Sequence, residues 1–124
     1  MASVACNAYS KATGNYSYAG GYYSKATNSG AHAEGSMVFA SGNYCFAIGS
    51  YSVATEDNQV VIGKYNAATV TGSGVNATYS NVGNYAFIIG NGSGNTTAKR
   101  KNALTVDWSG NVTASGHVYS KIAD

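Results

Sequence analysis

The sequence predicts an all-β protein, a flattened parallel β-solenoid (β-roll) whose coils contain 14 residues each. Two observations lead to this fold. A seven-residue repeat runs without a gap through residues 1–63. In addition, 73 of the 124 residues are Gly, Ala, Ser, Thr or Asn, whereas Leu, Ile, Val and Phe number only 1, 5, 11 and 3. Small side chains fill a narrow interior and not a broad one, so the repeat is expected to stack into a thin structure.

The nine heptads share their third, fifth and seventh positions. The fifth is Ala in the first eight heptads and Val in the ninth, and the seventh is Gly in six of the nine. A helix with Gly or Asn in nearly every heptad would be heavily penalised, so we expect short strands with a turn at position seven. Side chains alternate along a strand, so positions three and five point inward together. One strand cannot enclose an interior, so two heptads form one coil, in layers about 4.8 Å apart.

The fourth and sixth positions point outward and separate two faces. Even heptads carry Lys11, Lys25 and a ladder of hydroxyl side chains there, which indicates a solvent face. Odd heptads carry mostly apolar side chains, which indicates a subunit interface. The candidate interface residues are Tyr18, His32, Glu34, Phe46, Ile48, Val60 and Ile62. Because an interior of Ala and Ser buries little apolar area, a single chain is expected to be marginally stable without partners.

Three segments carry a resemblance to known head repeats. NYCFAIGSYS (43–52) and NYAFIIGNGS (84–93) resemble the N-S-V-A-I-G signature in the head domains of trimeric autotransporter adhesins, and SGAHAEGS (29–36) is similar to the same repeats in bacteriophage tail fibres. The resemblance covers residues 1–63 and implies a homotrimer of left-handed parallel β-rolls. It implies a structural and adhesive module of a phage or prophage tail fibre, located on a virion, which binds a host cell-surface glycan or protein. The alternative that it implies is the head domain of a bacterial cell-surface trimeric adhesin.

His32 and Glu34 are the one charged pair on the odd face. Alternate residues of a strand lie about 7 Å apart along the chain, so we expect no direct bond between the two side chains. Each should instead find a partner on a neighbouring chain and set the alignment of the trimer, because a buried ion pair can fix register. An ion held by three His32 side chains is a secondary possibility.

The remaining half of the chain departs from the heptads. Residues 64–83 are out of phase and predict a loop or insertion. Residues 84–124 predict a further β-roll strand and a small β-hairpin region, with strands over Ala103–Asp107 and Val112–Ser115. The order of VIGKYN (61–66), AFIIGNGSGN (86–95) and NALTVDWSGNVTASG (102–116) resembles that of phage and prophage tail proteins upstream of a self-cleaving chaperone domain. Because the heptad phase already runs at Met1, we expect the chain to be one segment of a longer fibre.

Position two of the even heptads places aromatic side chains on one strand. Tyr9, Tyr23 and Tyr51, with Met37 between them, are expected to form a ladder near the exposed face. Tyrosine supplies large, rigid, amphipathic contact area, so the ladder is either a cover for the edge of the roll or a receptor-binding site. A third possibility is ice binding by the hydroxyl ladder, which the neighbouring lysines disfavour. That ladder is Thr13, Thr27, Ser41 and Thr55.

Signals for other functions are weak. His32 and Glu34 form an H-x-E, but a zinc deaminase also needs P-C-x-x-C, and the chain contains no Pro. GNGSGN (90–95) is followed by no apolar helix, which argues against a dinucleotide loop. We therefore expect no enzyme, metal or cofactor. With 10% charged residues, a net charge of +2 and no apolar run near 18 residues, we also expect neither disorder nor membrane insertion.

The cationic and thiol side chains complete the expectations. Lys99, Arg100 and Lys101 form the one basic cluster, which we interpret as a solvated loop and not as a nucleic-acid site. Cys6 and Cys45 lie 39 positions apart, nearly three coils. At the layer spacing this is roughly 13 Å along the stack, beyond the limit near 7 Å between the Cα atoms of a disulfide, so we expect no bridge within the chain.

Overall fold

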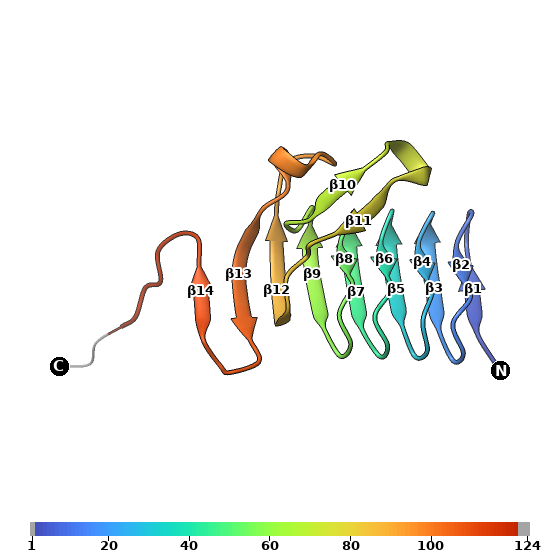
Figure 1. Ribbon diagram of the computed structural model, residues 1–124, viewed down its shortest axis with the longest axis horizontal. Helices are drawn as coiled ribbons and strands as arrows, with labels where there is room; N and C mark the ends of the chain where they lie inside the picture. Colours follow the sequence, from blue (N-terminus) through green and yellow to red (C-terminus); the bar gives the residue numbers. More distant parts are fainter. Residues whose placement is uncertain (1, 122–124) are drawn as a thin grey trace.

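The computed structural model describes residues 2–121. Two parallel sheets face each other along a stack of coils (Figure 1). Through the heptad region, each strand pairs in parallel with the one 14 residues further on: Val4 lies opposite Tyr18, Tyr18 opposite His32, and His32 opposite Phe46. This register confirms the parallel β-solenoid with 14-residue coils. The repeat strands are β1 (Val4–Cys6), β3 (Tyr18–Tyr22), β5 (His32–Ser36), β7 (Phe46–Ser50) and β9 (Val60–Lys64) in one sheet, and β2 (Lys11–Ala12), β4 (Lys25–Ala26), β6 (Phe39–Ala40) and β8 (Val53–Ala54) in the other.

The interior is the predicted column of small side chains. Positions three and five supply most of the fully buried residues, from Ser17 and Ala19 to Val61. The interior serines also hold successive coils together, because Ser24 Oγ donates to the Gly35 carbonyl and Ser52 Oγ to the Gly63 carbonyl, both at 3.0 Å. The narrow core is thus formed by Ala methyls and by hydroxyls that bond within it.

Two residues shape each turn that leads from an odd heptad to an even one, where we expected one. Position seven has left-handed backbone, with Asn7 in the first of these turns and a Gly in the later ones, such as Gly49 with φ of 124°. Position two also takes left-handed backbone in every heptad from the second to the ninth, mostly with a bulky residue such as Tyr51 at φ of 54°. The position-two residues with positive φ are Tyr9, Tyr16, Tyr23, Gly30, Met37, Tyr44, Tyr51, Asn58 and, in the following segment, Tyr65. Left-handed backbone costs an L-residue about 1 to 2 kcal/mol, so the stack must offset this strain with its interlayer hydrogen bonds.

Residues 64–83 contain an antiparallel hairpin. Its strands β10 (Thr69–Thr71) and β11 (Thr78–Ser80) are joined by the 3₁₀ turn η1 (Gly74–Asn76). The hairpin lies over the even-heptad sheet (Figure 1), where the Phe39 and Tyr79 ring centroids are 5.9 Å apart and Val53 is fully buried. The expectation that the whole even face meets solvent is therefore wrong for its C-terminal half, because apolar residues replace Lys at its fourth positions.

The last strands extend the odd-heptad sheet. β12 (Tyr85–Asn91) continues the parallel order, with Phe87 opposite Val60 and Ile89 opposite Ile62. β13 (Asn102–Asp107) and β14 (Val112–Ala114) then add antiparallel, after the 3₁₀ turn η2 (Thr97–Lys99), and complete a sheet of eight strands. Within residues 2–121 there is no helix with the length and apolar character needed to cross a membrane.

Candidate functional site

The outer face of the eight-stranded sheet carries an ordered apolar surface, called here the odd face. Rings from position four stack in register, with centroids 4.6 Å apart from Tyr18 to His32 and again from His32 to Phe46. The side chains of this face are only partly buried, as expected for a surface that the rest of the protomer leaves open. The column continues through Val60 and Phe87, and the column beside it contains Glu34, Ile48, Ile62 and Ile89.

His32 and Glu34 bond to each other, which corrects the sequence-based expectation. His32 Nε2 lies 3.3 Å from Glu34 Oε2, with the two side chains 32% and 52% exposed. The two residues stand on the same side of β5, and their side chains lean toward each other across the spacing of alternate residues. The two side chains therefore already bond to each other within one protomer. Any role in aligning this chain with a neighbouring one would have to come from the rings of Tyr18 and Phe46, which stack on either side of His32.

In the turns that lead into the even-heptad strands, the predicted aromatic ladder forms but divides into two parts. Tyr9 and Tyr23 stack with centroids 4.6 Å apart, and Tyr51 stacks on Tyr65 at 4.8 Å. Met37 lies at the repeat position between the two pairs. Tyr9 is exposed, whereas Tyr23, Met37 and Tyr51 are half-buried. The four candidate residues are thus on one edge, but only its N-terminal end is freely accessible.

Sequence reasoning missed Tyr22, which completes the accessible end of the ladder. Its ring meets Tyr23 edge-on at 4.8 Å and Tyr9 edge-on at 6.3 Å between centroids, and it is 51% exposed. The Tyr22–Tyr23 doublet was the available signal, because the last residue of an odd heptad strand and position two of the next heptad meet at the same turn.

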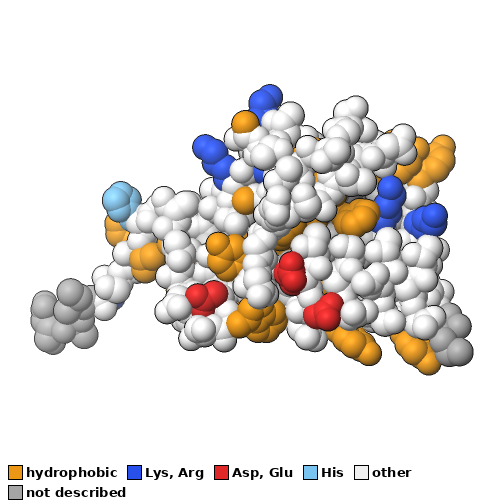
Figure 2. All heavy atoms as spheres, viewed as in Figure 1, with side chains coloured by type: hydrophobic (Ala, Val, Ile, Leu, Met, Phe, Trp, Pro, Cys, Tyr) orange, Lys and Arg blue, Asp and Glu red, His pale blue; other side chains and the backbone are white. Residues whose placement is uncertain are grey.

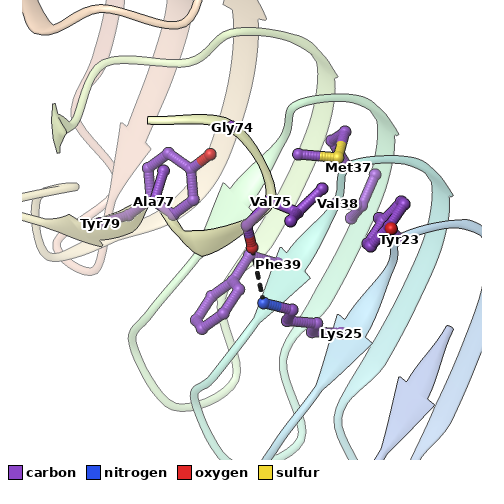
Figure 3. Close-up of a pocket in the computed structure, with 9 residues that line it drawn as sticks. All are labelled: Tyr23, Lys25, Met37, Val38, Phe39, Gly74, Val75, Ala77 and Tyr79. Carbon is purple, nitrogen blue, oxygen red and sulfur yellow. Dashed lines mark hydrogen bonds between the residues drawn. The ribbon is translucent and has the colours of Figure 1, made fainter. Parts of the chain in front are cut away.

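A shallow cleft separates the ladder from the hairpin. Met37 and Phe39 come from the coils, Val75 and Tyr79 from the hairpin, and Lys25 Nζ donates to the Val75 carbonyl at 3.0 Å (Figure 3). The enclosed volume is about 10 Å³, which holds no more than one water molecule. The cleft is therefore too small for an enclosed ligand, and recognition on this face has to use its exposed rim.

Arg100 is buried, so the interpretation of the basic cluster as a solvated loop is wrong at this residue. Arg100 is 4% exposed, and its Nη1 donates to the carbonyls of Tyr51 and Asn66, each at 3.0 Å. Its Nη2 donates to Asn95 Oδ1 at 2.7 Å, and the guanidinium carbon lies 4.7 Å from the centroid of the Tyr79 ring. Burial lowers the pKa of Arg100 from its ordinary value. Lys99 and Lys101 are exposed as expected.

Asn66 and Gln59 close the end of the coil stack with side-chain hydrogen bonds. Asn66 Oδ1 accepts from the Val53 N–H at 2.8 Å, and its Nδ2 donates to the Val53 carbonyl at 2.9 Å, as a neighbouring strand would. Gln59 Nε2 donates to the carbonyls of Gly83 and Tyr85, both at 2.9 Å. These polar groups are buried and satisfied, so they organise the junction with the hairpin and offer no free atom to a ligand.

The two cysteines are free thiols whose side chains lie on opposite faces of the odd-heptad sheet. Cys45 points into the core and is 1% exposed, and burial raises its pKa to about 11. Cys6 points outward, with Sγ 3.4 Å from the Tyr18 hydroxyl. Two strands, β3 and β5, separate β1 from β7 in the sheet, in agreement with the predicted coil register.

In the described part of the chain, no group of three or more His, Cys, Asp or Glu side chains could hold a metal ion. Comparisons of the chain with protein families, with curated proteins and with solved structures found no match. The structure forms two surface features from the predicted residues, which are the odd face and the tyrosine edge at the turns between the two sheets.

Proposed function

We propose that the protein is a non-enzymatic structural and adhesive module of a homotrimeric phage or prophage tail fibre, which presents a receptor-binding surface. The observation that carries this proposal is the odd face, a mostly apolar surface that follows one sheet from β3 to β12 in continuous parallel register. A structural module needs such a lengthwise contact, because it must align whole chains along their axis.

The odd face supports self-association because of its chemistry and its extent. Phe46, Ile48, Val60, Ile62 and Phe87 lie on neighbouring strands and remain partly exposed in one protomer. An apolar surface of this kind in water marks an interaction site or an aggregation hazard. A closed ring of identical copies covers it without leaving an open end. The resemblance of NYCFAIGSYS to trimeric head repeats favours three copies.

The adhesive part of the proposal rests on what the assembly would leave free. The tyrosine edge lies at the turns that join the two sheets, and the hairpin lies over the even-heptad sheet, opposite the odd face. The hairpin tip from residue 71 to 76 is exposed, and so are Tyr9 and Tyr22. These features would stay accessible in a trimer closed through the odd face, as a receptor-binding surface requires.

Multi-angle light scattering tests the assembly directly. We expect the purified protein to have about three times the chain mass of 12.7 kDa at micromolar concentration. Phe46→Asp places three carboxylates in the proposed interface and should dissociate the trimer, whereas Lys11→Asp on the opposite sheet should leave the mass unchanged. A wild-type protein that is a folded monomer under these conditions, with the β-sheet signal in circular dichroism retained, contradicts the proposal.

A further inference from the structure

Three exposed or half-exposed tyrosines form one cluster at the N-terminal end of the ladder, called here the tyrosine platform: Tyr9, Tyr22 and Tyr23. Tyr9 is 69% exposed and Tyr22 is 51% exposed, although both rings already contact Tyr23. The mutual stacking fixes the orientation of the rings before any ligand arrives. A preorganised aromatic surface loses little conformational entropy on binding.

Two lysines stand beside the platform on adjacent strands. Lys11 and Lys25 are direct partners in the pairing of β2 with β4, and each follows a platform tyrosine by two residues. Lys25 Nζ is held by the Val75 carbonyl at 3.0 Å, a neutral acceptor that leaves the ammonium its full charge. The Lys11 side chain is exposed, and its ammonium makes no hydrogen bond or ion pair within residues 2–121, whereas its backbone N–H donates to the Ser24 carbonyl at 2.8 Å.

The charges near the platform are of one sign. The heptads that carry it, residues 8–14 and 22–28, contain both lysines and no carboxylate. On the face shown in Figure 2, the basic side chains lie in the upper half, where the strands of the odd-heptad sheet end, and the acidic ones lie in the lower half. The platform therefore offers aromatic area together with an uncompensated positive potential, which attracts an anionic ligand.

The chemistry of the platform selects among anionic ligands. Tyrosine rings present an apolar surface and a hydroxyl that hydrogen-bonds, which suits a sugar ring with its apolar C–H groups and its hydroxyls. Two lysines are too few for a nucleic acid, whose affinity comes largely from many phosphate contacts. The shallow cleft nearby excludes a deeply inserted side chain of a protein partner, because it holds at most one water molecule.

We propose that the tyrosine platform, with Lys11 and Lys25, binds an acidic saccharide through ring contacts to the sugar and ammonium contacts to its carboxylate. The inference rests on the proposed function, because it names the ligand class of the adhesive surface. Tyr9 and Tyr22 contact the sugar faces, and the lysines choose acidic over neutral sugars.

The test uses an array of uronic-acid and sialic-acid oligosaccharides, each next to its carboxyl-reduced neutral counterpart, with a poly-glutamate peptide as the competing class. We expect the purified full chain to bind acidic members and to lose at least about tenfold in affinity on carboxyl reduction, the scale of one lost charge-assisted contact. Lys11→Gln combined with Lys25→Gln should abolish this preference. Equal binding of acid and neutral forms, binding of poly-glutamate alone, or no binding to any member overturns the inference.

A matched pair of variants assigns the site. Tyr9→Asn should lose binding, because Tyr9 belongs to the tyrosine platform, whereas Tyr44→Asn should retain it. The two residues are matched, since both occupy position two, both are 69% exposed and both have left-handed backbone. Asn tolerates that backbone and occurs there naturally at Asn58, so folding should survive both changes. Equal losses in the two variants contradict the assignment. Light scattering on the same samples separates the two proposals, because a trimer that binds no acidic saccharide fails only this inference.

Discussion

Arg100 brings together segments that are distant in the sequence. Its guanidinium joins the carbonyl of Tyr51 in the coil stack, that of Asn66 before the hairpin, and the Asn95 side chain in the C-terminal loop. Its charge has no carboxylate partner in these contacts, and the Tyr79 and Tyr65 rings lie 4.7 and 5.8 Å away. Arginine suits such a place because its planar fork donates several hydrogen bonds at once.

Replacement of Arg100 should be the most destabilising change in the basic cluster. Arg100→Met leaves the carbonyls of Tyr51 and Asn66 without their donor inside the protein, which should lower the free energy of unfolding by about 2 to 4 kcal/mol. Lys101→Met is the matched control, because Lys101 is exposed and should change stability by less than about 0.5 kcal/mol. Urea denaturation measures the free energy of unfolding of both variants. A similar small effect of the two substitutions would argue against a stabilising role of the Arg100 hydrogen bonds.

Cys45 couples its burial to pH. The folded pKa is about 11, against an ordinary value of 9.0, so the folded state binds the proton more tightly than the unfolded state. The stability from the neutral thiol is complete below pH 9 and is lost as the pH rises from 9 toward 11. Between pH 8 and pH 10, the free energy of unfolding of the wild type should fall by about 1 kcal/mol relative to that of Cys45→Ala. Alanine fits this site because Ala31 occupies the equivalent position two heptads earlier. Parallel urea titrations of the two proteins at both pH values check this, and a constant difference contradicts it.

At the scale of elements, the turns between the two sheets decide how closely the coils approach. Gly49, the last residue but one of β7, has φ of 124°, and a Cβ added there would collide with the Gly63 carbonyl of the next coil. Gly74 at the hairpin tip also has positive φ, 61°, but a Cβ there would have no neighbour within 4 Å. Substitution of Gly74 therefore measures the cost of left-handed backbone alone, whereas substitution of Gly49 adds the cost of a collision between layers.

Alanine substitutions at these glycines should differ strongly. Gly49→Ala combines strained backbone with a backbone collision and should cost about 3 kcal/mol or more, whereas Gly74→Ala should cost about 1 kcal/mol. Thermal unfolding followed by circular dichroism compares the two variants. Equal shifts in Tm would mean that the coils can separate locally without loss of cooperativity.

At the scale of the whole molecule, the two sides of the solenoid have different chemistry. The odd face is a continuous apolar sheet surface with the His32–Glu34 pair inside it. The other side is divided between an open part with Lys11 and Lys25 and a part that the hairpin covers. If three copies close through the odd face, a change there affects assembly and folding together, while a change on the open part does not.

Substitutions on the two sides test that asymmetry. His32→Ala removes a ring that stacks at 4.6 Å on both Tyr18 and Phe46, and aromatic pairs contribute about 0.5 to 1.5 kcal/mol each. Lys25→Ala removes one hydrogen bond at the surface. We expect His32→Ala to lower the Tm by several degrees more than Lys25→Ala does. Negligible effects from both would show that the odd face is not the face buried in the assembly.

The repeating part of the fold was predictable from the sequence because each of its causes is local and recurs. The alternation of side chains and the small residues at positions three and five predicted the parallel solenoid, its 14-residue coil and its interior. The hairpin over β13 and β14 was also predictable, since Trp108, Ser109, Gly110 and Asn111 mark a turn between alternating segments. The position-two ladder was predicted correctly as a column, but not its division into an open and a covered part.

Tertiary structure alone decided the features that occur once. The hairpin over Val53, the burial of Arg100 and the closure of Asn66 onto β8 depend on residues that are 13 to 49 positions apart and have no repeating counterpart. The His32–Glu34 bond depends on rotamers, which a strand spacing does not define. A periodic sequence specifies the contacts between one coil and the next, because the same residue types meet again in every layer. Contacts that close the stack are made by single residues across long loops, and their partners are chosen only when the folded chain brings them within reach.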